Sequence, residues 1–352
     1  MTAVVVTFSQ FMDEALYAPG TGFYERGGHA GRRGDFLTGP EVGPLFGAVV
    51  ARALDAWWAE IGEPDPFLVD EHGAGSGTLA RTVLAADPGC SAALRWTLVE
   101  RSAAQRDRHA DHLPFVDGDQ PVWQELGAGP RVTSASAAPD RPAQVVLANE
   151  LLDNLPFDLF ERSGRSWDAV LVGAGPAEVL APATHADAAA LDRFAPEAQV
   201  GARVPLQRQA GEWLGARLDG LEPGGRVVII DYVSTTDALA ARPTEEWLRT
   251  YRAHGRGGSP LAAPGAQDIT AEVCVDQLAH AARPPDQQRP QAEALRSWGI
   301  DELVAEGRQR WDDRTGPPDL DLLRLRSRIG EAEALLDPGG LGDFQVLEWE
   351  AD

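Results

Sequence analysis

The chain has 352 residues, 43% hydrophobic and 24% charged, which predicts a globular protein of one large domain with insertions or of two domains. Its formal net charge of −23 disfavours nucleic-acid binding and suits a basic partner, and all 31 basic residues are arginine, which excludes a Schiff-base lysine and a Walker phosphate loop. Two cysteines, no long apolar run and no signal-like N-terminus predict a cytoplasmic protein without disulfides, metal site or membrane span.

The first sixty residues predict an N-terminal helical cap with a lid loop. Apolar residues at helical spacing predict helices at 8–17 and 44–61. The segment between them has glycine on both sides and carries Asp35, Thr38 and Glu41. We expect this polar loop to fold over a bound cofactor, although the same side chains could instead cap the second helix.

Residues 61–233 alternate between strand and helix patterns. Short apolar strands are predicted at 67–69, 94–99, 144–148 and 226–230, with helices at 78–86 and 102–112. Strands separated by helices predict an α/β fold with a parallel, doubly wound sheet. We therefore expect this region to be the cofactor-binding core.

The chain beyond residue 233 breaks this rhythm. Residues 234–335 are rich in Ala, Pro and Arg and contain few β-branched runs, which predicts an insertion that is helical at 295–308 and 320–336 and shapes the substrate region. The alternating pattern within 336–352 predicts a terminal edge strand that returns to the core sheet.

A glycine-rich turn, Gly73-Ala74-Gly75-Ser76-Gly77, follows the first core strand and opens a helix. Glycines allow positive φ and close approach of a ligand. The dinucleotide pattern fails because Thr78 stands where its third glycine should fall. The turn remains compatible with S-adenosylmethionine, or with a plain strand–helix connection.

Two carboxylates favour the S-adenosylmethionine interpretation. Glu71 stands just before the glycines, where it would stay ionised and bind the ammonium group of the cofactor directly or through water. Glu100 ends the next strand, where it would accept both ribose hydroxyls. A dinucleotide enzyme would also use an acid there, so Glu100 alone does not discriminate. The predicted cofactor-binding residues are Thr38, Glu71, Gly73, Ala74, Gly75, Gly77, Glu100 and Asn149.

Ordered motifs along nearly the whole chain resemble the MidA family, the mitochondrial complex I assembly-factor arginine methyltransferases and their bacterial relatives. The motifs lie at 15–19, 22–24, 34–42, 71–79, 148–156, 226–232, 251–254, 260–270, 291–300 and 344–347. The resemblance implies a class I methyltransferase (Rossmann-like) fold, S-adenosyl-L-methionine as cofactor and a protein arginine as acceptor. The sequence departs from the family at Glu272, where histidine is expected, and this departure motivates a small metabolite as an alternative acceptor.

An arginine acceptor requires carboxylates that hold its guanidinium group and steer one nitrogen toward the methyl group. Glu150 and Asp153 follow the strand that ends at Ala148, at the edge of the sheet where ligands bind, and are the predicted catalytic residues. Asn149 would bridge to the amino acid end of the cofactor. Alternatively, this segment only caps a helix, with its acids near the helix dipole.

Further residues are expected to contact the acceptor. They are Asp35, Glu41, Tyr232, Tyr251 and His254. Tyr232 ends a core strand at the same sheet edge, and Tyr251 and His254 would line the approach of the acceptor, although a structural role is an alternative for each. The −23 charge also leaves open a cofactor-binding assembly factor without turnover. The expected partner is a protein bearing arginine, and a homodimer is left open.

Overall fold

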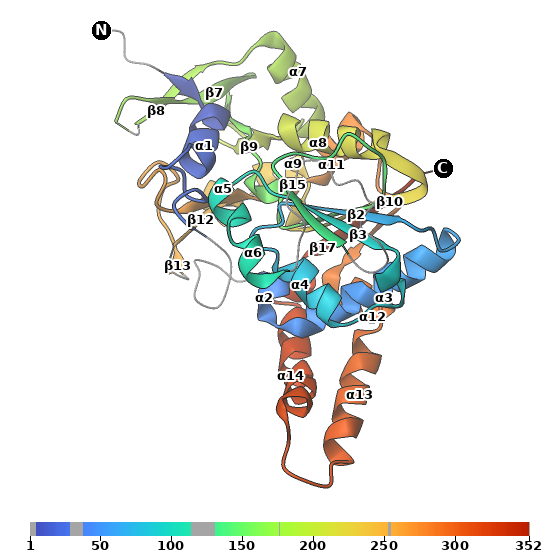
Figure 1. Ribbon diagram of the computed structural model, residues 1–352. Coiled ribbons are helices and arrows are strands. Elements are labelled where there is room, and N and C mark those ends of the chain that lie inside the picture. Colours follow the sequence, from blue (N-terminus) through green and yellow to red (C-terminus); the bar gives the residue numbers. More distant parts are fainter. Residues whose placement is uncertain (1–4, 29–37, 114–130, 176, 253–254, 352) are drawn as a thin grey trace.

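The computed structural model describes residues 5–28, 38–113, 131–175, 177–252 and 255–351. A seven-stranded sheet forms its centre, and a five-stranded antiparallel sheet lies above it in the view of Figure 1. Among the described residues, no helix has both the length and the apolar character that a membrane crossing requires.

The central sheet has the strand order β16-β17-β10-β5-β2-β3-β4. Its strands are β2 (Phe67–His72), β3 (Leu94–Val99), β4 (Arg131–Ala135), β5 (Ala143–Asn149), β10 (Leu221–Asp231), β16 (Gln287–Pro290) and β17 (Gln345–Glu350). Strands from β4 to β10 pair in parallel, whereas β17 is antiparallel to both of its neighbours. The predicted return of the chain end to this sheet is correct, but its edge position is wrong, because β16 pairs with the outer side of β17.

Helices cover both faces of the central sheet. One face carries α3 (Pro44–Glu60), α4 (Thr78–Ala85) and α12 (Gln291–Ser297), and the other carries α8 (Arg208–Asp219) and α11 (Val275–Ala281). Consecutive residues of β5 alternate between the two layers, with Leu147 in the core under α3 and Val146 in the core under α8. The predicted doubly wound α/β architecture is therefore confirmed.

The second sheet interrupts the predicted core and was not anticipated from the sequence. It comprises β1 (Val6–Thr7), β6 (Asp158–Ser163), β7 (Ser166–Gly173), β8 (Ala177–Pro182) and β9 (Arg203–Leu206), with α7 (His185–Phe194) between β8 and β9. The first helix, α1 (Phe8–Tyr17), begins at a capping box formed by Thr7 and Gln10 and packs on β6 and β7. The N-terminal cap is thus anchored on this sheet.

The remaining elements are short, except for one helical hairpin. A small sheet contains β12 (Leu248–Arg252), β13 (Gly255–Arg256) and β14 (Asp268–Ala271), and β11 (Val233–Ser234) pairs with β15 (Val273–Cys274). Short helices are α2 (Gly39–Val42), α5 (Ala103–Arg106), α6 (His109–His112), α9 (Thr236–Ala240) and α10 (Thr244–Trp247), and 3-10 turns span Gly89–Ala92, Leu152–Asn154 and Leu341–Asp343. The hairpin of α13 (Ile300–Asp312) and α14 (Leu320–Leu335) projects away from the sheets, as Figure 1 shows.

Two predictions for these regions need correction. The polar helix expected at 102–112 is broken into α5 and α6. Residues 234–335 are not a separate insertion, because they include β16, a strand of the central sheet. The helix predicted at 320–336 is confirmed as α14, whereas the segment predicted at 295–308 is divided between the end of α12 and most of α13.

Candidate active site

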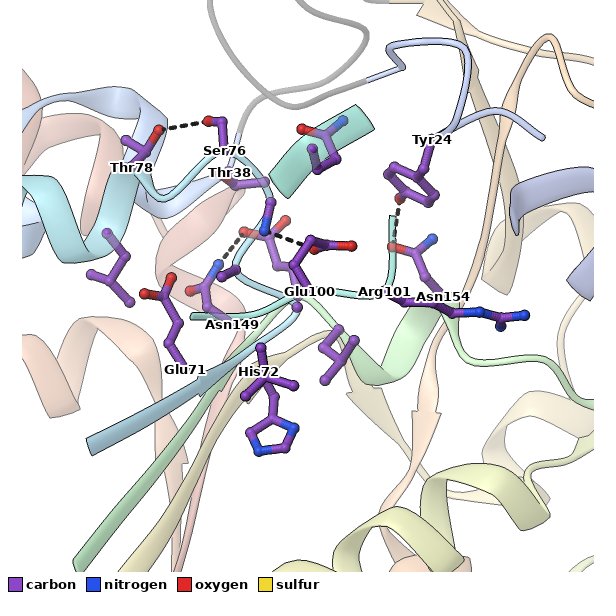
Figure 2. A pocket seen from close by; sticks show the side chains of 18 of the residues that line it. Tyr24, Thr38, Glu71, His72, Ser76, Thr78, Glu100, Arg101, Asn149 and Asn154 are labelled. Atoms are coloured by element: carbon purple, nitrogen blue, oxygen red, sulfur yellow. Dashed lines mark hydrogen bonds between the residues drawn. The ribbon is translucent and has the colours of Figure 1, made fainter. Parts of the chain in front are cut away.

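A cavity of about 230 Å³ opens at the carboxyl ends of the parallel strands. Its wall combines the turns after β2, β3, β4 and β5 with residues of the N-terminal segment, and Figure 2 shows part of it. Nine of the residues predicted for the site line this cavity. They are Thr38, Glu41, Glu71, Gly73, Ala74, Gly75, Glu100, Asn149 and Glu150.

The glycine turn requires the conformational freedom of its glycines. Gly73, Gly75 and Gly77 have φ angles of 67°, 53° and 81°, in the left-handed region. A Cβ on Gly73 would lie 2.8 Å from Leu151, whereas a Cβ on Gly75 would meet no atom within 4 Å. The backbone of Gly75 therefore faces open space in the cavity wall. Gly77 does not line the cavity but is the N-cap residue that precedes the helix α4.

Glu100 is held by backbone amides at the end of β3. Gly75 N–H donates to its Oε2 at 2.9 Å, and Ser102 N–H donates to its Oε1 at 2.7 Å. Burial raises the pKa of this carboxyl group, and the two amide donors oppose that shift. Each carboxylate oxygen retains acceptor capacity for a further donor, so the side chain is suited to bind a pair of hydroxyl groups.

Glu71 lies deeper in the same wall. Trp96 Nε1–H donates to its carboxylate at 2.9 Å, and burial raises its pKa to about 8. An ammonium group bound nearby would oppose this shift, because an opposite charge favours the ionised carboxylate. The ionised state predicted for Glu71 therefore depends on a bound cation.

Glu41 lines the cavity beside the glycine turn. Thr78 Oγ1–H donates to its Oε1 at 2.5 Å, which ties α2 to the first residue of α4. Figure 2 shows Thr78 next to Ser76, with the buried Thr38 nearby. Thr38 and Glu41 therefore both line the cavity next to the glycine turn.

Glu150 combines an unusual backbone with an available carboxylate oxygen. Its φ of 51° lies in the left-handed region, which is uncommon outside glycine and clusters at functional sites. Its Oε1 accepts hydrogen bonds from Gly39 N–H and Asn149 Nδ2–H, both at 3.2 Å. Its Oε2 accepts none from the described residues. Burial, followed by the charge of Asp153, raises the pKa of Glu150 to about 8.

Asp153 lies behind the cavity wall. Its Oδ2 accepts a hydrogen bond from Thr270, and its own N–H donates to Asp231 at 3.3 Å. Its Oδ1 is buried without a hydrogen-bond partner among the described residues. Burial raises the pKa values of both Asp153 and Asp231. Of the two predicted catalytic carboxylates, only Glu150 faces the cavity.

Two described residues that were predicted to contact the acceptor, Tyr232 and Tyr251, do not line the cavity. Tyr232 packs on Phe344, with 3.9 Å between ring centroids, and lies under the guanidinium of Arg249. Tyr251 is half-buried in β12, away from the cavity wall. Asp35 and His254 lie outside the described residues.

A polar network that sequence reasoning did not assign to the site closes the cavity from the N-terminal side. Tyr24 Oη lies 3.0 Å from both Asn154 Oδ1 and Asp268 Oδ1, and Asn154 Nδ2–H donates to Asp268 at 3.1 Å. Figure 2 shows Tyr24 and Asn154 facing each other. The single hydroxyl proton of Tyr24 can form a full hydrogen bond with only one of these two oxygens. If Asp268 is protonated, Tyr24 can donate to Asn154 and accept from Asp268, so that both contacts are hydrogen bonds. Burial raises the pKa of Asp268 to about 7, which favours that form near neutral pH.

The position of Tyr24 and Asp268 in the family-like motifs was the available signal for this network. Tyr17 also lines the cavity and stacks on Tyr24, with 5.5 Å between ring centroids. The pairing of an N-terminal tyrosine with an aspartate 244 residues away depends on tertiary packing.

The cavity wall fits S-adenosylmethionine. Glu100 offers two carboxylate oxygens, the Gly75 backbone permits close approach, and Asn149 Oδ1 is buried without a partner among the described residues, so a donor on the cofactor would complete it. Across the described ranges, no group of three or more His, Cys, Asp or Glu side chains is arranged to hold a metal ion.

Comparisons with known proteins agree with this geometry. Residues 49–291 match the model of a family described as "Putative S-adenosyl-L-methionine-dependent methyltransferase". The chain is 27% identical to the Drosophila melanogaster protein named protein arginine methyltransferase NDUFAF7 homolog, mitochondrial, over 79% of this chain and 66% of that protein. It is also 27% identical to the Mus musculus protein arginine methyltransferase NDUFAF7, over 96% of this chain and 79% of that protein.

A solved structure supports both the fold and the cofactor. The crystal structure of a Burkholderia thailandensis protein bound to S-adenosyl-homocysteine aligns with a TM-score of 0.75 and 26% identity, over 98% of this chain and 88% of that chain. The predicted cofactor and Rossmann-like fold are thereby confirmed.

Proposed function

Because the chain belongs to the family of S-adenosyl-L-methionine-dependent methyltransferases, we propose that it transfers the methyl group of this cofactor to an arginine side chain of a protein. The observation that carries the proposal is Glu150 Oε2, a carboxylate oxygen at the cavity that accepts no hydrogen bond from the described residues. The names of the curated relatives and the net charge of −23 support a basic acceptor.

Residues on one side of the cavity bind the cofactor, which when bound supplies an electrophilic methyl group. Glu100 accepts hydrogen bonds from hydroxyl groups, while Gly39 and Asn149 hold Glu150 in place through its Oε1. The Glu71 carboxylate and Asn149 Oδ1 are available to accept hydrogen bonds from the ammonium group at the amino acid end of the cofactor. The glycine turn allows the ligand to approach the backbone closely.

Glu150 binds and orients the acceptor. A guanidinium group next to its Oε2 would form a charge-assisted hydrogen bond, which is stronger than a neutral one. The positive charge would also lower the raised pKa of Glu150, so acceptor binding would convert the carboxyl group to the carboxylate. The carboxylate then holds one guanidinium nitrogen in line for transfer and accepts the proton that the methylated nitrogen loses.

The departure at Glu272 does not favour a metabolite acceptor. Glu272 pairs with Arg242 and with Arg249, the latter at 2.8 Å, and it does not line the cavity. Its carboxylate is therefore used within the fold, where it holds two arginines, and it is not part of the wall around Glu150.

Labelling with methyl-labelled S-adenosylmethionine tests the proposal. The purified protein would be incubated with the protein fraction and, separately, with the small-molecule fraction of a cell extract, and labelled protein would be hydrolysed to amino acids. We expect label in protein that co-elutes with methylated arginine and disappears with Glu150→Gln. Label confined to small molecules or to another amino acid would refute the arginine acceptor. Absence of S-adenosylhomocysteine production above the no-substrate background would support an assembly factor without turnover.

A further inference from the structure

A fully buried histidine lies directly behind the glycine turn. His109 Nε2 lies 2.8 Å from the carbonyl oxygen of Gly75, and its Nδ1 lies 2.9 Å from Ser134 Oγ on β4. A carbonyl oxygen can only accept, so Nε2 carries the ring proton and Nδ1 accepts from the serine hydroxyl. Burial also lowers the pKa of His109, in agreement with a neutral ring in this one tautomer.

The Gly75 residue is therefore held at both of its backbone polar groups. Its N–H donates to Glu100 Oε2, and its carbonyl accepts from His109. Glycine in the left-handed region has wide conformational freedom, and the site of its missing Cβ faces open space. The peptide group that carries the Gly75 N–H is also held by a hydrogen bond from Gly77 N–H to the Ala74 carbonyl at 2.9 Å, whereas the next peptide group is held through its carbonyl by His109.

The short helix that carries His109 also supports the end of the turn. A Cβ on Gly77 would lie 3.0 Å from Leu113 Cδ1 and 3.6 Å from His109 Cδ2. The α6 segment thus packs against Gly77 and bonds to Gly75, so it contacts the turn from the side away from the cavity. The hydrogen bond from His109 to the Gly75 carbonyl is the polar contact between α6 and the glycine turn.

We propose that His109 is a positioning residue for the cofactor: by holding the Gly75 carbonyl, it directs the Gly75 N–H to Glu100 and keeps the Glu100 carboxylate oriented for ligand binding. Loss of this contact would free the Gly75–Ser76 peptide group to rotate, and the change in the Gly75 backbone angles would loosen the N–H donor to Glu100. The inference concerns the cofactor site alone and holds whichever molecule receives the methyl group.

Two substitutions of similar size and polarity separate the two hydrogen bonds of His109. The side-chain amide of asparagine reaches the position of Nδ1, so His109→Asn keeps a partner for Ser134 and loses the one for Gly75. The longer side chain of glutamine places an N–H donor near the position of Nε2, so His109→Gln keeps the Gly75 contact. Ser134→Ala is the matched control that removes the partner of Nδ1 only.

Calorimetric titration of the ligand-free variants with S-adenosylhomocysteine is the test. We expect His109→Asn to weaken binding about tenfold, the effect of losing about one hydrogen bond, and His109→Gln and Ser134→Ala to stay within about threefold of the parent protein. Equal affinities for His109→Asn and His109→Gln, whether both weak or both unchanged, would overturn the proposal.

Hydrogen exchange of the ligand-free variants provides a second readout that needs no ligand. The amides at 73–77 should exchange faster in His109→Asn than in His109→Gln, while β3 exchanges alike in both. Equal exchange of the turn in the two variants would contradict the positioning role, even if one of them were too unstable for titration. Since neither measurement involves an acceptor, failure here leaves the proposed arginine acceptor untouched.

Discussion

Two carboxylates that line the cavity, Glu100 on the proposed cofactor side and Glu150 on the proposed acceptor side, differ in how many of their oxygens are paired. The two Glu100 oxygens accept from Gly75 and Ser102. Glu150 has one oxygen without a partner among the described residues. The cofactor side is built from the turns after neighbouring parallel strands, whereas the acceptor side combines β5 with distant segments.

This difference indicates that the two sides are preorganised to different degrees before ligands bind. The cofactor side is organised before ligand binding, because backbone amides already orient its carboxylate. Burial raises carboxyl pKa values on both sides, Glu71 on the proposed cofactor side and Glu150 on the proposed acceptor side each to about 8. A cation would favour the charged form of each group, so we expect the ammonium group of the cofactor to act on Glu71 and a basic acceptor to act on Glu150.

The largest expected effect is the loss of methyl-transfer rate when Glu150 is substituted. Glu150→Gln should lower the rate of methyl transfer by about 100-fold or more, because it removes the carboxylate that binds the acceptor and takes its proton. Glutamine keeps an oxygen for Gly39 N–H, so affinity for S-adenosylhomocysteine should stay within about threefold. Initial rates and calorimetry measure the two quantities. A parallel loss of both would place Glu150 on the cofactor side.

Glu100→Ala should instead weaken binding of the cofactor. Loss of its charge-assisted hydrogen bonds should weaken S-adenosylhomocysteine binding by about 1.5–3 kcal/mol. The exposed Glu302, on the projecting hairpin, supplies a matched control, and Glu302→Ala should leave the affinity unchanged. Binding of parental strength in Glu100→Ala would show that the cofactor is held elsewhere.

The raised pKa of Glu150 predicts a pH dependence of stability. The folded protein keeps a proton on Glu150 up to a pKa of about 8, whereas the ordinary value is 4.5, so between these values the folded state binds more protons than the unfolded state. The free energy of unfolding should therefore fall as pH rises from about 5 to 8. Thermal unfolding of the ligand-free protein at several pH values measures this slope. Glu150→Gln should make the slope shallower, and an unchanged slope would contradict the assigned pKa shift.

The smallest expected effect concerns the network between the two sides. Tyr24→Phe removes the hydroxyl that contacts Asn154 and Asp268, which should lower the free energy of unfolding by about 1 kcal/mol in denaturant titrations. Affinity for S-adenosylhomocysteine should change by less than about threefold. A large loss of affinity with little loss of stability would assign Tyr24 to cofactor binding instead.

The cofactor side was largely predictable from the sequence because its signals are local. Glu71 and the glycines are contiguous, and Glu100 ends the next strand, so parallel pairing of β2 and β3 brings them to one edge. Asp268 and His109 carried no such signal. Each reaches the site through contacts with residues far along the chain, which a local pattern does not encode.

The missed parts of the fold have a similar cause. The residues of β16 are polar and mostly exposed, so they show no apolar pattern, and the strand exists because β17 offers it a pairing edge. The residues of β8 are likewise mostly exposed, so this strand, which pairs with β7, was not predicted. In both cases tertiary pairing overrides weak local preference.

A crystal structure with S-adenosylhomocysteine bound tests the division of the cavity most directly. We expect Glu100 to accept hydrogen bonds from the ribose hydroxyls and Glu150 Oε2 to face the open space beside the sulfur atom. A ligand that contacts Glu150 through its ribose, or a Glu150 carboxylate turned away from the sulfur, would contradict this division.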